Sequence, residues 1–213
     1  MTKALWAEWF KANEEWFLSV YDSPRQIRKK FTENDDIMIA NGCSKVCIVD
    51  KDADFVLKWT IGSNTTFNEM QREFAYYEEA KTLGLTQFFP KTELFIQCGD
   101  ITIYAQEKIS IAHCDLSYGQ RETMNKKYST VKGRTLKKAT ASFYTRPPVD
   151  WVRAAIAIYG KKQVKRLTEF TREKKINDLH SANVGYRGSY PVILDFSGFH
   201  RDSEDCYSSS SSC

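Results

Sequence analysis

The chain has 213 residues, of which 42% are hydrophobic and 14% aromatic, and its formal net charge is +4. This apolar content is enough for a folded core and excludes a disordered composition. The charge is too small to indicate a nucleic-acid partner, and no apolar run reaches the length of a membrane span. The six cysteines include no Cys-x-x-Cys pair, so we expect reduced thiols in a cytoplasmic protein.

Residues 1–24 predict one amphipathic helix that ends at Ser23-Pro24. Its apolar residues recur at spacings of three, four and seven: Leu5, Trp6, Trp9, Phe10, Trp16, Phe17 and Val20. Two interpretations of this aromatic face stay open. The helix packs against its own domain, or it docks a partner or a second copy of the chain.

Residues 25–109 predict an antiparallel sheet with one helix. Residues 25–36 are charged and predict a connection or an edge strand. Strands are expected over 37–49, interrupted by a tight turn, and over 55–59, 92–97 and 101–109, because β-branched and alternating apolar residues favour strands. The helix is expected over 66–81, with Asn64, Thr65 or Thr66 as its cap and Phe67, Met70, Phe74 and Tyr77 on one face.

Two charged residues of this region stand out. Lys58 lies in a strand between apolar neighbours, which is unusual for a lysine unless it is paired or belongs to a site. Glu73 lies beside the apolar face of helix 66–81, fifteen residues further on. The sequence therefore predicts a pair between Lys58 and Glu73, with Glu69 as the competing partner.

The second half of the chain is less regular at first. Residues 110–149 predict no clear element, whereas helices are expected over 151–159, ended by Gly160, and over 161–174. Basic residues concentrate in 121–138 and 161–175. We expect these stretches to be solvated faces, and a phosphate-rich or acidic partner is the alternative.

Short strands at 184–186 and 192–194 are joined by a turn and flanked by polar residues. Asp178 and Asn183 precede the first strand, and Asp195 follows the second. A hairpin places these two carboxylates and one amide at one mouth. Such oxygen ligands suit a hard cation such as Mg²⁺, which binds one or two carboxylates together with substrate phosphates.

The residues Asp178-Leu179-His180, then Asn183, then Asp195-Phe196-Ser197-Gly198, resemble the catalytic and metal-binding loops of the protein-kinase-like superfamily. The usual His-Arg pair is replaced by Ile176-Asn177. His180 replaces a lysine, as in small-molecule phosphotransferases and in many bacterial and phage kinase-like proteins. The chain most resembles the minimal phage and bacterial effector members, because almost nothing follows Phe199 where a large helical region is usual.

The resemblance implies a role for each candidate residue. Asp178 would orient a substrate hydroxyl and accept its proton, while Asn183 and Asp195 would hold Mg²⁺ or Mn²⁺. Lys58, fixed by Glu73, would contact the phosphates of ATP. The turn with Gly42 and Ser44 would be a reduced glycine-rich loop, and the backbone of Glu107 and Lys108 would bind the adenine.

We therefore expect an α+β, two-lobed kinase-like fold. Its parts would be an N-terminal helix (1–24), an N-lobe (25–109), a truncated C-lobe (110–200) and a disordered serine-rich tail (201–213). The expected function is ATP- and Mg²⁺-dependent transfer of the γ-phosphate to a hydroxyl, most simply on a protein, in a cytoplasm that could be a host cell's. A pseudokinase that binds nucleotide or a partner without transfer is the alternative, and an unrelated α+β binding protein is the third.

Overall fold

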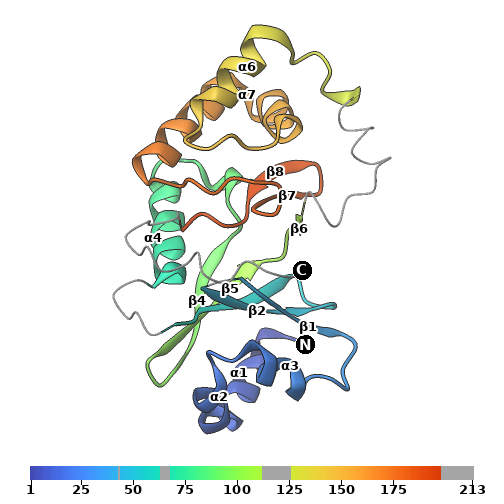
Figure 1. Cartoon of the computed structure of the whole chain (residues 1–213), viewed down its shortest axis with the longest axis vertical. Helices are drawn as coiled ribbons and strands as arrows, with labels where there is room; N and C mark the ends of the chain where they lie inside the picture. The colour runs from blue at the N-terminus through green and yellow to red at the C-terminus, as the bar shows by residue number, and fades with distance from the viewer. Residues whose placement is uncertain (43, 63–67, 112–125, 198–213) are drawn as a thin grey trace, which may run out of the picture.

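The computed structural model describes residues 1–42, 44–62, 68–111 and 126–197, and the fold is mixed α+β (Figure 1). Its larger sheet is antiparallel, with the strand order β1-β2-β3-β5-β4. The strands are β1 (Ile37–Asn41), β2 (Lys45–Asp50), β3 (Phe55–Thr60), β4 (Thr92–Cys98) and β5 (Ile101–Glu107). The predicted strands are therefore confirmed, and the expected tail at 201–213 lies outside the described residues.

Helices cover both faces of this sheet. Helices α1 (Lys3–Ala12), α2 (Glu14–Val20) and α3 (Pro24–Lys30) lie on one face, at the bottom of Figure 1, and α4 (Glu69–Thr82) lies on the other. Alternation along the strands explains the two faces, because successive side chains of a strand point to opposite sides. Val46, Ile48 and Leu57 are buried against the N-terminal helices, whereas Lys45 faces α4.

The aromatic N-terminal segment packs against its own sheet. Trp6, Phe10 and Phe17 are almost completely buried in one core with Trp59 of β3, and the rings of Phe17 and Trp59 are 5.2 Å apart. The Trp6 Nε1–H donates a 3.2 Å hydrogen bond to Asp50 Oδ2, which satisfies the polar atom of this buried ring. These contacts support the first of the two interpretations of this face.

Two predictions for this segment were wrong. The helix expected over 1–24 breaks at Asn13 into α1 and α2. Pro24 does not end the helical region but opens α3, so residues 25–36 begin as a helix and not as a strand. A proline fits the first turn of a helix because its fixed φ is already helical and its missing N–H has no partner there.

Helix α4 carries Glu73 to the sheet. It begins after Asn68, whose side chain accepts a hydrogen bond from the Gln71 N–H and so caps the helix. Met70 and Glu73 are fully buried, and the Phe74 ring lies 5.7 Å from that of Tyr104 on β5. The predicted helix is confirmed from residue 69 onward, whereas Phe67 and the caps expected at 64–66 lie outside the described residues.

The C-terminal half has its own core around a long helix and a small sheet. Helix α7 (Val149–Glu173) is kinked at Gly160, where φ is +82°, so the two helices predicted around this glycine are confirmed. The small sheet has the order β6-β7-β8, formed by β6 (Ser110–Ile111), β7 (Val184–Arg187) and β8 (Tyr190–Ile193). Helix α6 (Gly133–Ser142) packs on α7 and was not predicted.

Two contacts fix the small sheet: one joins it to α7, and the other lies between β6 and β7. The Trp151 Nε1–H is shared between the carbonyl oxygens of Gly185 and Val192, at 3.3 and 3.2 Å. A Cβ atom on Gly185 would lie 2.3 Å from the Ser110 carbonyl oxygen, so only glycine allows β6 this close to β7. No helix within the described ranges is long and apolar enough to cross a bilayer.

Candidate functional site

The loop that contains Asp178 is positioned by the end of helix α7. The N–H groups of Lys175 and Ile176 donate to the carbonyls of Arg172 and Thr171, at 3.1 and 2.8 Å, which is the Schellman arrangement. Lys175 occupies the left-handed position with φ of +52°. Ile176 and Leu179 are buried in the core of this half, so the loop is held by apolar side chains while Asp178 stays about half exposed.

Asp178 and Asn183 are joined through their side chains. Asn183 Nδ2 donates to the Asp178 carbonyl at 2.8 Å and to Asp178 Oδ2 at 3.1 Å. His180 Nε2 lies 3.5 Å from Asp178 Oδ1, and His180 Nδ1 accepts the Ala182 N–H at 3.1 Å. Because Nδ1 is an acceptor, the proton of a neutral His180 is on Nε2, the ring nitrogen nearer the aspartate. The carboxylate is therefore held by Asn183 and has the His180 ring nearby.

Asp195 is brought beside this loop by the end of β8. The Leu194 N–H donates to the Asn183 carbonyl at 2.8 Å, which ties the two loops together one residue before Asp195. Phe196 is fully buried, with its ring 4.9 Å from that of Phe89. The buried aromatic side chain anchors the segment, so the carboxylate next to it cannot swing far from Asn183.

A buried lysine links Asp195 to helix α4. Lys45 Nζ lies 2.6 Å from Asp195 Oδ1, 2.7 Å from Glu73 Oε1 and 3.3 Å from Glu69 Oε2. Ser197 Oγ lies 3.4 Å from the same Nζ. Three carboxyl groups on two elements therefore surround one ammonium group, and we call Lys45, Glu69, Glu73 and Asp195 the Lys45 cluster.

The charges of this cluster shift the protonation of its members. Burial lowers the pKa of Lys45, but Glu73, Asp195 and Glu69 outweigh this effect and raise its pKa above the ordinary value. Burial would raise the pKa of Asp195, but Lys45 outweighs it and lowers this pKa to about 2. Burial raises the pKa of Glu73 in spite of Lys45. Asp195 thus stays ionised, and Glu73 is the carboxylate that is protonated before Asp195 as the pH falls.

The predicted pair between Lys58 and Glu73 is wrong in its lysine. Lys58 Nζ donates to Gln106 Oε1, and Gln106 Nε2 in turn donates to Glu73 Oε2 at 3.2 Å. Both lysines face α4, Lys45 from β2 and Lys58 from the neighbouring strand β3, where Lys58 lies opposite Cys47. From its position on β2, Lys45 reaches Glu73 directly. Lys58 is therefore one side chain removed from the carboxylate.

The residues expected around the nucleotide are placed unevenly. Gly42 and Ser44 lie in the β1–β2 turn directly before Lys45, and their backbone groups bond Lys45 O and the Ile61 N–H. The N–H groups of Glu107 and Lys108 donate to the carbonyls of Lys91 and Asp54, both at 2.8 Å. Neither N–H is therefore free to bind adenine, and adenine binding by this backbone stays a prediction for its carbonyl groups.

The side chains of Glu107 and Lys108 have structural partners as well. Glu107 forms a bidentate pair with Arg187 of β7, and this arginine also donates to the Phe89 carbonyl at 3.0 Å. Lys108 Nζ donates to the Asp50, Lys51 and Ala53 carbonyls at the β2–β3 turn. These contacts fasten the end of β5 to both sheets.

Sequence reasoning missed Lys45 and Gln106. One signal was available for Lys45, because it alternates with Val46 and Ile48 and so shares the face of Lys58 rather than the apolar face. The pattern could not show which of two lysines on that face reaches Glu73, since both are within one strand of it. Gln106 gave no signal, because a glutamine at the end of a strand is usually solvated.

The oxygen atoms of this site fit a hard cation. Asn183 Nδ2 is turned to Asp178, and within the described residues no donor is directed at its amide oxygen. The Asp195 side chain is 34% exposed, and its Oδ1 is the atom that bonds Lys45. No group of three or more His, Cys, Asp or Glu placed to hold a metal occurs in the described part of the chain. Mg²⁺ does not require one, since one or two carboxylates and a phosphate suffice.

The structure therefore joins five predicted residues, Lys58, Glu73, Asp178, Asn183 and Asp195, in one chain of contacts that runs through Lys45 and Gln106. One end presents the half-exposed carboxylate of Asp178, and the other end is the ammonium group of Lys58 on the large sheet. When the sequence was compared with models of protein families and with curated proteins, neither comparison gave a match.

Proposed function

We propose that the protein is an ATP- and Mg²⁺-dependent phosphotransferase with a two-lobed kinase-like fold, and that it moves the γ-phosphate to a hydroxyl group, most simply on a protein. The observation that carries the proposal is the joining of Asp178, Asn183 and Asp195 by the hydrogen bonds of two loops. Phosphoryl transfer depends mainly on positioning and on charge stabilisation, so fixed carboxylates beside fixed cations are what it needs.

Each residue then has a defined task. Asp178, held by Asn183 and close to His180, accepts a hydrogen bond from the acceptor hydroxyl and takes its proton. Asn183 and Asp195 would hold Mg²⁺, which would offset the charge of the phosphates. Lys45, and not Lys58 alone, supplies positive charge next to Asp195, and Glu73 keeps its ammonium in place.

Transfer of labelled γ-phosphate from ATP tests the proposal. Wild-type protein is compared with Asp178→Ala, Asp195→Ala and a control, Asp100→Ala, which changes an exposed carboxylate in the β4–β5 turn. We expect transfer by the wild type and the control, loss of transfer but retained Mg-ATP binding in Asp178→Ala, and loss of both in Asp195→Ala. Tight Mg-ATP binding by Asp195→Ala contradicts the assignment of the metal ligands.

A second candidate is a pseudokinase that binds nucleotide or a partner without transfer. Two observations favour it: three carboxylates already neutralise Lys45, and the N–H groups of Glu107 and Lys108 are engaged. The same assay separates the two functions. Thermal stabilisation by Mg-ATP without labelled product, in the presence of varied acceptors and Mn²⁺ as well as Mg²⁺, supports the pseudokinase.

A further inference from the structure

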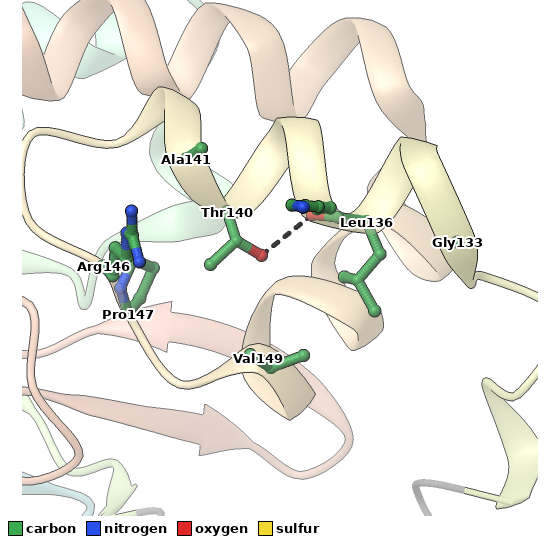
Figure 2. Close-up of a pocket in the computed structure, with 8 residues that line it drawn as sticks. Gly133, Leu136, Thr140, Ala141, Arg146, Pro147 and Val149 are labelled. Carbon is green, nitrogen blue, oxygen red and sulfur yellow. Dashed lines mark hydrogen bonds between the residues drawn. The ribbon is translucent and has the colours of Figure 1, made fainter.

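A hollow of about 400 Å³ lies outside the candidate site, between helix α6 and the start of α7 (Figure 2). Its apolar lining includes Leu136 on α6 and Pro147 and Val149 on the connection to α7. Figure 2 shows Leu136, Thr140 and Val149 directed toward the space between the two segments. Val149 is 48% exposed, so the apolar lining is open to a ligand from solvent.

The charged residues of this hollow are all basic. Lys137 and Arg146 line it and are exposed, and within the described ranges neither forms an ion pair with a carboxylate. The nearest acidic residue along the chain, Asp150, is held by Arg153 at 3.0 Å. Two unneutralised cations over an apolar floor favour an anionic ligand that also has an apolar part.

The surroundings extend this positive field. A second hollow of about 270 Å³ lies on the opposite flank of α6, and its charged lining residues are Lys138, Lys161 and Lys165, of which Lys165 lies 3.6 Å from the Glu169 carboxylate. The described lining residues of the two hollows include no carboxylate. An acidic chain approaching α6 therefore meets positive charge on both flanks, which increases its rate of encounter at low salt.

The hollow is attached to the loop that contains Asp178. Thr145, one residue before Arg146, accepts the Leu179 N–H through Oγ1 at 3.1 Å. The segment that forms one wall of the hollow is thus hydrogen-bonded to the residue after Asp178. The wall of the hollow is therefore one hydrogen bond away from the loop that contains the proposed catalytic base.

We propose that this hollow binds an acidic segment of the acceptor protein, with carboxylates on Lys137 and Arg146 and an apolar side chain against Leu136 and Val149. The role as an acceptor site rests on the proposed function, whereas the binding does not. An acidic peptide is favoured over a nucleic acid because the described lining has no aromatic ring on which a base could stack.

Fluorescence anisotropy with the full chain tests the binding. The probe is a labelled twelve-residue peptide of Asp and Glu with one Leu and one Ser, and a Lys-rich peptide of equal length is the reference. The variant Lys137→Glu/Arg146→Glu is compared with Lys138→Glu/Lys161→Glu, which makes the same charge change on the other flank of α6. We expect the first to weaken binding of the acidic peptide at least tenfold, and the second less than threefold.

A further variant tests the apolar part without changing a basic residue. Val149→Asp places a carboxylate in the hollow at the first position of α7, where a negative charge suits the helix dipole and the fold is retained. We expect Val149→Asp to weaken binding of the acidic peptide as much as Lys137→Glu/Arg146→Glu does. Equal losses in both double variants, or stronger binding of a single-stranded RNA oligonucleotide than of the peptide, overturn the proposal.

Labelled transfer to the same peptide separates this inference from the proposed function. Loss of both binding and transfer in the Lys137→Glu/Arg146→Glu variant supports both. Transfer to another protein by a chain that does not bind the peptide overturns the inference and leaves the phosphotransferase. Peptide binding without transfer to any acceptor leaves the binding site and overturns its role as an acceptor site.

Discussion

Replacing Lys45 with methionine tests which lysine the buried carboxylates depend on. The change removes the ammonium group but keeps most of the side-chain volume, so Glu73, Glu69 and Asp195 lose the cation that now lies 2.6 to 3.3 Å from them. Removing one partner of a buried ion pair typically costs about 3–5 kcal/mol. We therefore expect Lys45→Met to lower the free energy of unfolding strongly.

Glu73 can take up a proton and so avoid being left as an unpaired buried charge. The free energy of this protonation is therefore the upper limit of what Glu73 contributes to the destabilisation by Lys45→Met. With an ordinary pKa of 4.5, neutralising a carboxyl group costs about 3.4 kcal/mol at pH 7 and about 0.8 kcal/mol at pH 5. Burial already raises the pKa of Glu73, so without Lys45 the neutral form is favoured further. The destabilisation by Lys45→Met should thus be about 3 kcal/mol at pH 7 and about 1 kcal/mol at pH 5.

Urea unfolding at both pH values measures the effect, and Lys58→Met is the matched control. Lys58 donates to the neutral Gln106, so its loss should cost about 1 kcal/mol with little dependence on pH. In a chain of this length the Lys45 change corresponds to about 6–12 °C in Tm at pH 7. The reasoning is refuted if the two variants are destabilised equally. It is also refuted if the destabilisation by Lys45→Met is not smaller at pH 5 than at pH 7.

Three other changes have definite expected results. The ionised Asp195 stabilises the fold above its ordinary pKa of 3.8, and this contribution disappears as pH falls toward about 2. The stability difference between wild type and Asp195→Asn in urea should therefore be constant above about pH 5 and shrink below it, from a value of about 1 kcal/mol because the side chain is partly exposed; a difference that grows in acid contradicts this sign. Gly185→Ala should destabilise by more than about 2 kcal/mol, since its Cβ would meet a backbone oxygen at 2.3 Å, while Gly42→Ala, which has open space around it and no positive φ, serves as the comparison in thermal melts. Lys175→Gly should stabilise by about 0.5–1 kcal/mol because φ is +52° there, and unchanged urea unfolding would show that the helix end is not strained.

Much of the fold could be predicted from local patterns. The strands of the large sheet and the kink at Gly160 were visible because alternation, helical periodicity and glycine act over a few residues. Helix α6 was missed because its sequence, GRTLKKATAS, contains few large apolar residues, and Leu136 is the main apolar side chain that it buries. Helix α3 was missed because a proline can either end one helix or begin the next, and the sequence alone does not distinguish the two.

The sequence by itself determined which residue types lie at the ends of β8 and α7, and therefore that Asp178, Asn183 and Asp195 meet. The spacing of a short hairpin allows few other arrangements. Only the tertiary structure decided that Glu73 bonds Lys45 and that Gln106 stands between Glu73 and Lys58. That choice depends on how α4 lies across two neighbouring strands, and a difference of one strand, about 5 Å, is invisible to any local pattern.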